Sequence, residues 1–175
     1  LPAHTPARSM ESYLVPIESL LRQIIQQGGF ELTFVVRKSV AAEGDLETPE
    51  FVVDFSGADA DLLLEKHATL LDALEYAVLK AVRLEEDLFG KITLDCGDWR
   101  RLRAEELRLT AQVAAQRVVE TGDPFTLNPM SPRERRIIHL ALRDQPLVRT
   151  ASEGAGPERK VVIHPVPPPR QSPRR

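Results

Sequence analysis

A short helix within residues 129–143 is the most tightly specified element of this 175-residue chain. Ser131 suits the N-cap, Pro132 suits the first helical position, and Glu134 lies three residues after the cap, which together make a capping box. At about 100° per residue, basic and apolar side chains separate onto opposite sides of the helix. The basic side carries Arg135, Arg136, His139 and Arg143, and the apolar side carries Ile137, Ile138, Ala141 and Leu142. We therefore expect a helix with one cationic face and one core face.

The cationic face has two interpretations. A run of charges is most often solvated surface. Alternatively, the Arg135 guanidinium can offer a planar fork to a phosphate, with His139 one helical turn further along the same face. Arg149, Arg159 and Lys160 would extend the positive field. His139 itself can either donate to phosphate or hold the helix against a neighbouring strand, and both roles can coexist.

Charge is unevenly distributed along the chain. Residues 1–98 hold 8 Lys or Arg against 18 Asp or Glu, a net charge of −10, whereas residues 99–175 hold 15 against 8, a net charge of +7. Because Lys and Arg neutralise phosphates in most non-specific binding of nucleic acid, a polyanion should be repelled by the first part and attracted to the second. The helix that opens the second part is expected to present a basic surface, although Glu105 and Glu106 offer local pairs. This surface comprises Arg100, Arg101, Arg103, Arg108 and Arg117.

Apolar periodicity predicts a mixture of helices and strands. In the first part we expect a helix from Tyr13 to Gly28 with Pro16 in its first turn, a hairpin of strands at 30–36 and 51–55, a short helix ending near Leu64, a longer helix, and a strand at 92–96. The buried side of the longer helix should hold Leu70, Leu71, Leu74, Ala77, Val78, Ala81 and Val82. In the second part we expect a helix from Trp99 to about Glu120, the capped helix, and strands at 147–152 and 160–164. Residues 1–12 should be a disordered lead-in, and residues 165–175 a flexible tail rich in Pro and Arg.

Two stretches resemble known nucleic-acid-binding domains. The spacing Arg135-x-x-x-His139, with the later segments at 150–154 and 159–163, resembles the R-3-H domain, which binds single strands. The order helix, strand, strand, helix, helix, strand is that of a type II KH domain, and the pair of domains resembles the bacterial Jag family, also called SpoIIIJ-associated proteins. The expected fold is therefore α+β: a type II KH domain at residues 13–97, with helix on a three-stranded sheet, and a small R-3-H domain at residues 98–164, with helices on a small sheet.

The loop between the two consecutive helices departs from the family pattern. The family has Gly-x-x-Gly there, which clamps the nucleic-acid backbone because glycine lets phosphates approach closely. This chain has Glu65, Lys66, His67 and Ala68, so both glycines are absent and a carboxylate replaces the first. We expect this degenerate KH loop to be an exposed turn, although Lys66 and His67 offer an alternative phosphate contact.

The resemblance implies a cytoplasmic, non-catalytic protein that binds single-stranded nucleic acid, RNA more than DNA. Such a protein would act as a post-transcriptional regulator linked to cell elongation or division, with a small single-KH protein as a possible partner. The N-terminal Jag domain that usually precedes these two domains is expected to be absent. Two alternatives remain open: the degenerate KH half serves as a protein-interaction or dimerisation module, or scattered carboxylates form a metal-dependent nuclease.

Composition argues against several other classes of function. No cofactor or metal site is expected, because His4, His67, His139 and His164 show no ligand spacing, and the single Cys96 suits the core better than a metal. No apolar run of about 18 residues suggests membrane insertion, and the N-terminus lacks the pattern of a signal peptide. Aromatic residues make up 5% of the chain and are absent from the basic segment, so phosphate contacts with weak sequence selectivity are expected rather than base stacking.

Overall fold

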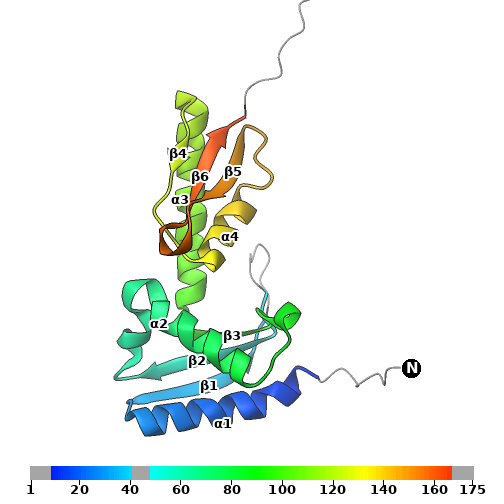
Figure 1. Cartoon of the computed structure of the whole chain (residues 1–175), viewed down its shortest axis with the longest axis vertical. Coiled ribbons are helices and arrows are strands. Elements are labelled where there is room, and N and C mark those ends of the chain that lie inside the picture. The colour runs from blue at the N-terminus through cyan, green and yellow to red at the C-terminus, as the bar shows by residue number, and fades with distance from the viewer. Residues whose placement is uncertain (1–8, 41–47, 167–175) are drawn as a thin grey trace, which may run out of the picture. The chain divides into compact units, whose positions relative to one another are not determined.

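The computed structural model describes residues 9–40 and 48–166 of the chain, which divides into two compact units, Leu1–Arg100 and Arg101–Arg175 (Figure 1). Each unit combines helices with a three-stranded sheet, so the expected α+β fold is confirmed. None of the helices within those ranges is long and apolar enough to cross a membrane. The expected disorder of residues 1–8 and flexibility of residues 167–175 lie outside the described residues.

The first unit is built on a mixed sheet of β1 (Leu32–Lys38), β2 (Phe51–Gly57) and β3 (Ile92–Cys96), in the order β1-β2-β3. Strands β1 and β2 are antiparallel, which confirms the expected hairpin, and β3 runs parallel to β2. Strand β1 starts later than Phe30, because the N–H of Phe30 donates to the Ile25 carbonyl and so belongs to the end of the preceding helix. This element order and strand pairing are those of a type II KH domain.

Helix α1 (Glu11–Gly28) buries Tyr13, Ile17 and Leu21, which are spaced by one helical turn, in the core of the first unit. It begins two residues before the expected start, so the predicted lead-in is wrong at residues 11 and 12. Pro16 consequently lies inside the helix and not in its first turn. The proline costs one backbone hydrogen bond, which the buried apolar stripe offsets.

Helix α2 (Ala60–Ala81) is two helices joined across a kink, followed by the short helix η1 (Glu86–Leu88). The first piece ends before Glu65, as expected from the sequence. In the second piece Leu71, Val78 and Leu79 are buried, whereas Leu70, Ala77 and Ala81 are exposed, which corrects the expected core face. Adjacent helical residues differ by about 100°, so burying Leu71 and Val78 turns their preceding neighbours towards solvent.

The degenerate KH loop adopts a backbone that its residue types do not favour. Glu65 is extended, at φ −57° and ψ 148°, but Lys66, His67 and Ala68 have φ values of 49°, 59° and 60°. Three successive residues without glycine therefore take the left-handed conformation, which costs about 1–2 kcal/mol for each such residue. The expected exposed turn is confirmed at Glu65, Lys66 and His67 but is wrong at Ala68, which is buried in the core. The Thr69 hydroxyl donates to the Lys66 carbonyl at 2.7 Å, so contacts on the following helix hold the loop in place.

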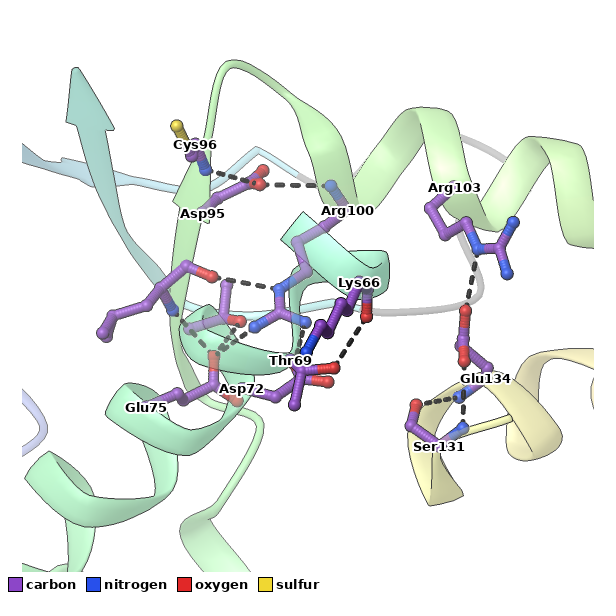
Figure 2. Close-up of polar contacts among 12 residues, drawn as sticks. Lys66, Thr69, Asp72, Glu75, Asp95, Cys96, Arg100, Arg103, Ser131 and Glu134 are labelled. Carbon is purple, nitrogen blue, oxygen red and sulfur yellow. Dashed lines mark hydrogen bonds and ion pairs between the residues drawn. The ribbon is translucent and has the colours of Figure 1, made fainter. Parts of the chain in front are cut away.

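A polar cluster around Arg100 covers the outer edge of β3 (Figure 2). Glu75 accepts from the Leu94 N–H at 2.8 Å, and Arg100 Nε donates to the Leu94 carbonyl at 3.0 Å. Arg100 also pairs with Asp72 and with Glu75, so both the N–H and the carbonyl of Leu94 at this edge have side-chain partners within one ion-pair cluster. Buried Asp95 accepts from the Arg100 N–H at 3.1 Å, and burial raises the pKa of its carboxyl group. Arg100 is thus part of the KH-like unit and not of a free basic surface.

The second unit comprises α3 (Trp99–Thr121), which begins in the first unit, and then β4 (Phe125–Thr126), α4 (Pro132–Ala141), β5 (Val148–Glu153), η2 (Gly156–Glu158) and β6 (Lys160–Pro165). Its antiparallel sheet has the order β4-β6-β5. Buried residues of α3, α4 and β6 form its interior, among them Ala111, Val118, Ile138, Val161 and Ile163. The two strands of the hairpin are confirmed within one residue at each end, and the short strand β4 was not predicted.

The left-handed loop predicts opposite effects for two neighbouring glycine substitutions. Lys66→Gly should raise the free energy of unfolding of the first unit by about 0.5–1 kcal/mol, because glycine removes the steric cost of a positive φ at an exposed position. Glu65→Gly, whose site has an ordinary φ, should lower it by about the same amount. Urea unfolding followed by fluorescence of Trp99, which packs against this core, measures both. Equal destabilisation by the two variants would contradict the strained-loop interpretation.

Candidate nucleic-acid interface

Helix α4 starts as its sequence predicts. The Ser131 hydroxyl accepts from the Glu134 N–H at 3.3 Å, and the Glu134 carboxylate accepts from the Ser131 N–H at 2.9 Å (Figure 2). Pro132 occupies the first turn, and Ile137, Ile138 and Leu142 are buried. The capping box and the apolar side of the helix are therefore confirmed.

Glu134 has a second role that the sequence did not reveal. Its other carboxylate oxygen accepts from Arg103 Nε of α3 at 2.7 Å, and the side chains of Arg103 and Glu134 are 17% and 12% exposed. Arg103 also donates to Glu106 at 2.8 Å, and Arg108 pairs with Glu105 at 2.6 Å. These two arginines of α3 are therefore neutralised by carboxylates. The expected local pairs with Glu105 and Glu106 are present, and the pair with Glu134 adds a partner that was not expected.

His139 joins α4 to β5 through both nitrogens of its ring. Nδ1 lies 2.5 Å from the Thr150 hydroxyl, and Nε2 lies 2.9 Å from the Ser152 hydroxyl. Side chains alternate across a strand, so Thr150 and Ser152 point to the same side of β5. Of the two roles considered for His139, the one that holds the helix against a strand is supported by these two contacts.

Arg135 belongs to the same cluster. Its Nη1 donates to the Ser152 hydroxyl at 3.2 Å, while its Nε is buried and has no hydrogen-bond partner among the residues that the structure describes. We call Arg135, His139, Thr150 and Ser152 the α4–β5 cluster. The sequence placed Arg135 and His139 on one face correctly, but it missed Thr150 and Ser152. Their spacing of two residues in a predicted strand was the available signal.

The imidazole of His139 is held in its neutral form. Burial lowers its pKa below the ordinary value, and the positive charge of nearby Arg135 lowers it further. A neutral ring offers one donor and one acceptor, which suits two hydroxyl partners. At neutral pH His139 is therefore a hydrogen-bonding residue without charge, and the positive charge of the cluster belongs to Arg135.

The structure separates the remaining predicted site residues. Arg136 is exposed on α4, but Arg143 follows the end of the helix and contacts Asp144 at 3.6 Å, so its expected place on the helical face is wrong. Side chains alternate along a strand, so Arg149, next to Thr150, faces the other side of the sheet. Lys160 lies opposite Glu153 in the strand register and faces that same side. The carbonyl of Arg159 accepts from the Met130 N–H at 3.2 Å, which places the Arg159 backbone close to the start of α4.

Cys96 is buried, as expected for a core residue, and burial raises the pKa of its thiol. Within the described ranges, no group of three or more His, Cys, Asp or Glu side chains is arranged to hold a metal ion. His164, which was not assigned a role, lies 3.1 Å from the Glu153 carboxylate on the far side of the sheet from His139.

The chain is similar to a known domain family over its second unit and to curated proteins over most of its length. The R-3-H domain family matches residues 105–165. Proteins named RNA-binding protein KhpB are 35% identical in Clostridium symbiosum, 32% in Lactiplantibacillus plantarum and 30% in Bacillus subtilis. These matches cover 71%, 63% and 79% of this chain, respectively. The chain spans 56% of the first relative, 34% of the second and 69% of the third.

The lowered pKa of His139 predicts how the stability of the second unit depends on pH. Well above pH 6.5 the histidine is neutral in both the folded and unfolded states, so its hydrogen bonds contribute fully. As pH falls below 6.5 the unfolded state binds a proton before the folded state does, and the free energy of unfolding should decrease. His139→Gln should weaken this dependence, whereas His67→Gln, in the first unit, should not. Hydrogen exchange of β5 and β6 amides between pH 7.5 and 5 measures it, and equal pH dependence in His139→Gln and wild type would refute the assignment.

Proposed function

The chain belongs to the KhpB family, also called the Jag family, and from this premise we propose that it binds single-stranded nucleic acid, RNA in preference to DNA, without catalysing a reaction on it. The relatives are named RNA-binding proteins, and the R-3-H match covers α4, β5 and β6. We assign the R-3-H domain to residues 98–164 and propose that it makes the main contacts with the nucleic acid. The KH domain occupies residues 13–97.

The distribution of arginine partners carries this proposal. Arg100, Arg103 and Arg108 are each paired with at least one carboxylate. In contrast, the hydrogen bond of Arg135 within the described residues goes to a neutral hydroxyl. No carboxylate within the described ranges forms an ion pair with Arg135, Arg136 or Arg159. A cation without an internal counter-charge retains its full attraction for phosphate. Arg135 therefore places a positive charge without a carboxylate partner among the described residues on the side of α4 and β5 where His139, Thr150 and Ser152 lie.

We assign phosphate contacts to Arg135 and Arg136, with Arg159 near the start of the same helix. Arg143, Arg149 and Lys160 extend the attraction over a wider surface and add less specific contacts. Phe125 is the one aromatic residue among the described residues of the second unit, and Arg117 already covers its ring at 5.4 Å. Sequence selectivity should consequently be weak, because base stacking contributes little.

The KH half is proposed to contact protein rather than RNA. Its part of the sequence carries a net charge of −10, and its loop has Glu65 where a glycine would admit phosphate. Val35 on β1 and Tyr76 on α2 are 64% and 60% exposed, which leaves apolar surface for a partner. A small single-KH protein or a second copy of this chain fits such a surface. Mass measurement in solution, with and without RNA, distinguishes self-association from a monomeric binder.

We place this activity in the cytoplasm, as regulation of transcripts linked to cell elongation or division. Crosslinking to RNA in cells, followed by sequencing of the bound strands, tests that assignment directly. Incubation of labelled RNA and DNA with Mg²⁺ tests the absence of catalysis. Intact strands support simple binding, and metal-dependent cleavage would favour the nuclease alternative.

Removal of Arg135 should change the salt dependence of binding. Each phosphate contact to a single strand contributes about 0.7 to the slope of log affinity against log salt, so Arg135→Ala should reduce that slope by about 0.7 for every sequence tested. Arg108→Ala is the matched control, because Arg108 lies in the same unit but is paired with Glu105. Fluorescence anisotropy of labelled oligonucleotides across a salt series gives both slopes. Unchanged slopes in Arg135→Ala would exclude α4 from the interface.

A further inference from the structure

The Ser152 hydroxyl is the point at which the two motif residues of α4 meet. Arg135 Nη1 lies 3.2 Å from it and His139 Nε2 lies 2.9 Å from it. Because Arg135 Nε is buried without a partner among the described residues, the contact with Ser152 is the hydrogen bond that fixes the position of the guanidinium. Loss of the Ser152 hydroxyl would leave Arg135 free to change rotamer.

The donor and acceptor in each hydrogen bond of the cluster follow from the chemistry of arginine and of neutral histidine. Arginine only donates, so Ser152 accepts from Arg135 and its own hydrogen is available for His139 Nε2. His139 then carries its hydrogen on Nδ1 and donates to the Thr150 hydroxyl. This assignment satisfies both ring nitrogens of a neutral histidine and orients a lone pair of Ser152 towards Arg135.

We propose that Ser152 is a positioning residue for nucleic-acid binding, which transmits the orientation fixed by His139 to the guanidinium of Arg135. His139 then acts on the ligand through Ser152 and not by direct contact with phosphate. The inference rests on the proposed function and deepens it. An arginine already held in one rotamer loses less conformational entropy when it binds, so the cluster increases affinity without adding a contact.

The proposal separates affinity from salt dependence. Ser152→Ala keeps the charge of Arg135, so the slope of log affinity against log salt should equal that of wild type. The affinity should nevertheless fall about fivefold, which corresponds to immobilising one long side chain. Ser152→Thr retains a hydroxyl and should restore most of the affinity. A role limited to folding would not produce this pattern, and Ile138→Val, at a fully buried position of α4, serves as a control that lowers stability but not affinity.

A double-mutant cycle on the full chain tests the path from His139. Ser152→Ala and His139→Gln should each weaken binding of a labelled oligouridine, and the double variant should be no weaker than the weaker single variant. Arg136 is exposed outside the α4–β5 cluster, so Ser152→Ala combined with Arg136→Ala should show additive losses. Additive losses for Ser152 and His139 would overturn the inference.

The remaining outcomes distinguish the inference from the function on which it rests. Wild-type affinity in Ser152→Ala, together with a reduced salt slope in Arg135→Ala, would leave the proposed function standing and overturn the role of Ser152. A wild-type chain that fails to bind any single strand would overturn both. If Ser152→Ala does not fold, Thr150→Val carries the same test, because it removes the Nδ1 partner of His139 with little change of shape. It should reduce affinity at constant slope, and wild-type affinity would refute the proposal.

Discussion

The bonds between the His139 ring and two hydroxyls of β5 are the contacts on which the candidate interface depends. Both ring nitrogens are engaged, so the imidazole fixes α4 against the strand and fixes the direction of the Ser152 hydroxyl at the same time. The ring can do this because burial and the charge of Arg135 keep it neutral. Their spacing places Arg135 and His139 on one face of α4. Hydrogen bonds to Thr150 and Ser152 of β5 then fix the orientation of both side chains.

Carboxylate partners decide which arginines contribute to the positive field. Arg100 is largely enclosed and joins Asp72 and Glu75 to the edge of β3. Arg103 joins α3 to α4 through Glu134 of the capping box. These charges stabilise the fold and add little external field, because a close opposite charge cancels them at a distance. The net charge of +7 over residues 99–175 therefore does not show which cations a phosphate meets or where they lie.

In the KH-like unit, the loop backbone has the conformation that glycine favours, but the side chains are not glycine. The loop lacks both glycines, yet Lys66, His67 and Ala68 adopt the positive φ values that glycine would tolerate. The buried methyl group of Ala68 and the core contacts of the adjoining helices fix the loop at that strained geometry. The unit keeps the framework of a type II KH domain, while its loop presents the exposed side chains of Glu65, Lys66 and His67 in place of an open glycine backbone.

Local sequence determined the main helices, every strand except β4 to within two residues, and the capping box of α4, because caps, turns and apolar periodicity act within a few residues. It also identified Arg135 and His139 as a pair on one face. Only the tertiary structure decided that Ser152 joins them, that Arg103 is neutralised by a residue 31 positions away, and that Arg149 faces the other side of the sheet. Those outcomes depend on which elements pack together and in which register, and long-range packing of that kind leaves no periodic signal in one sequence.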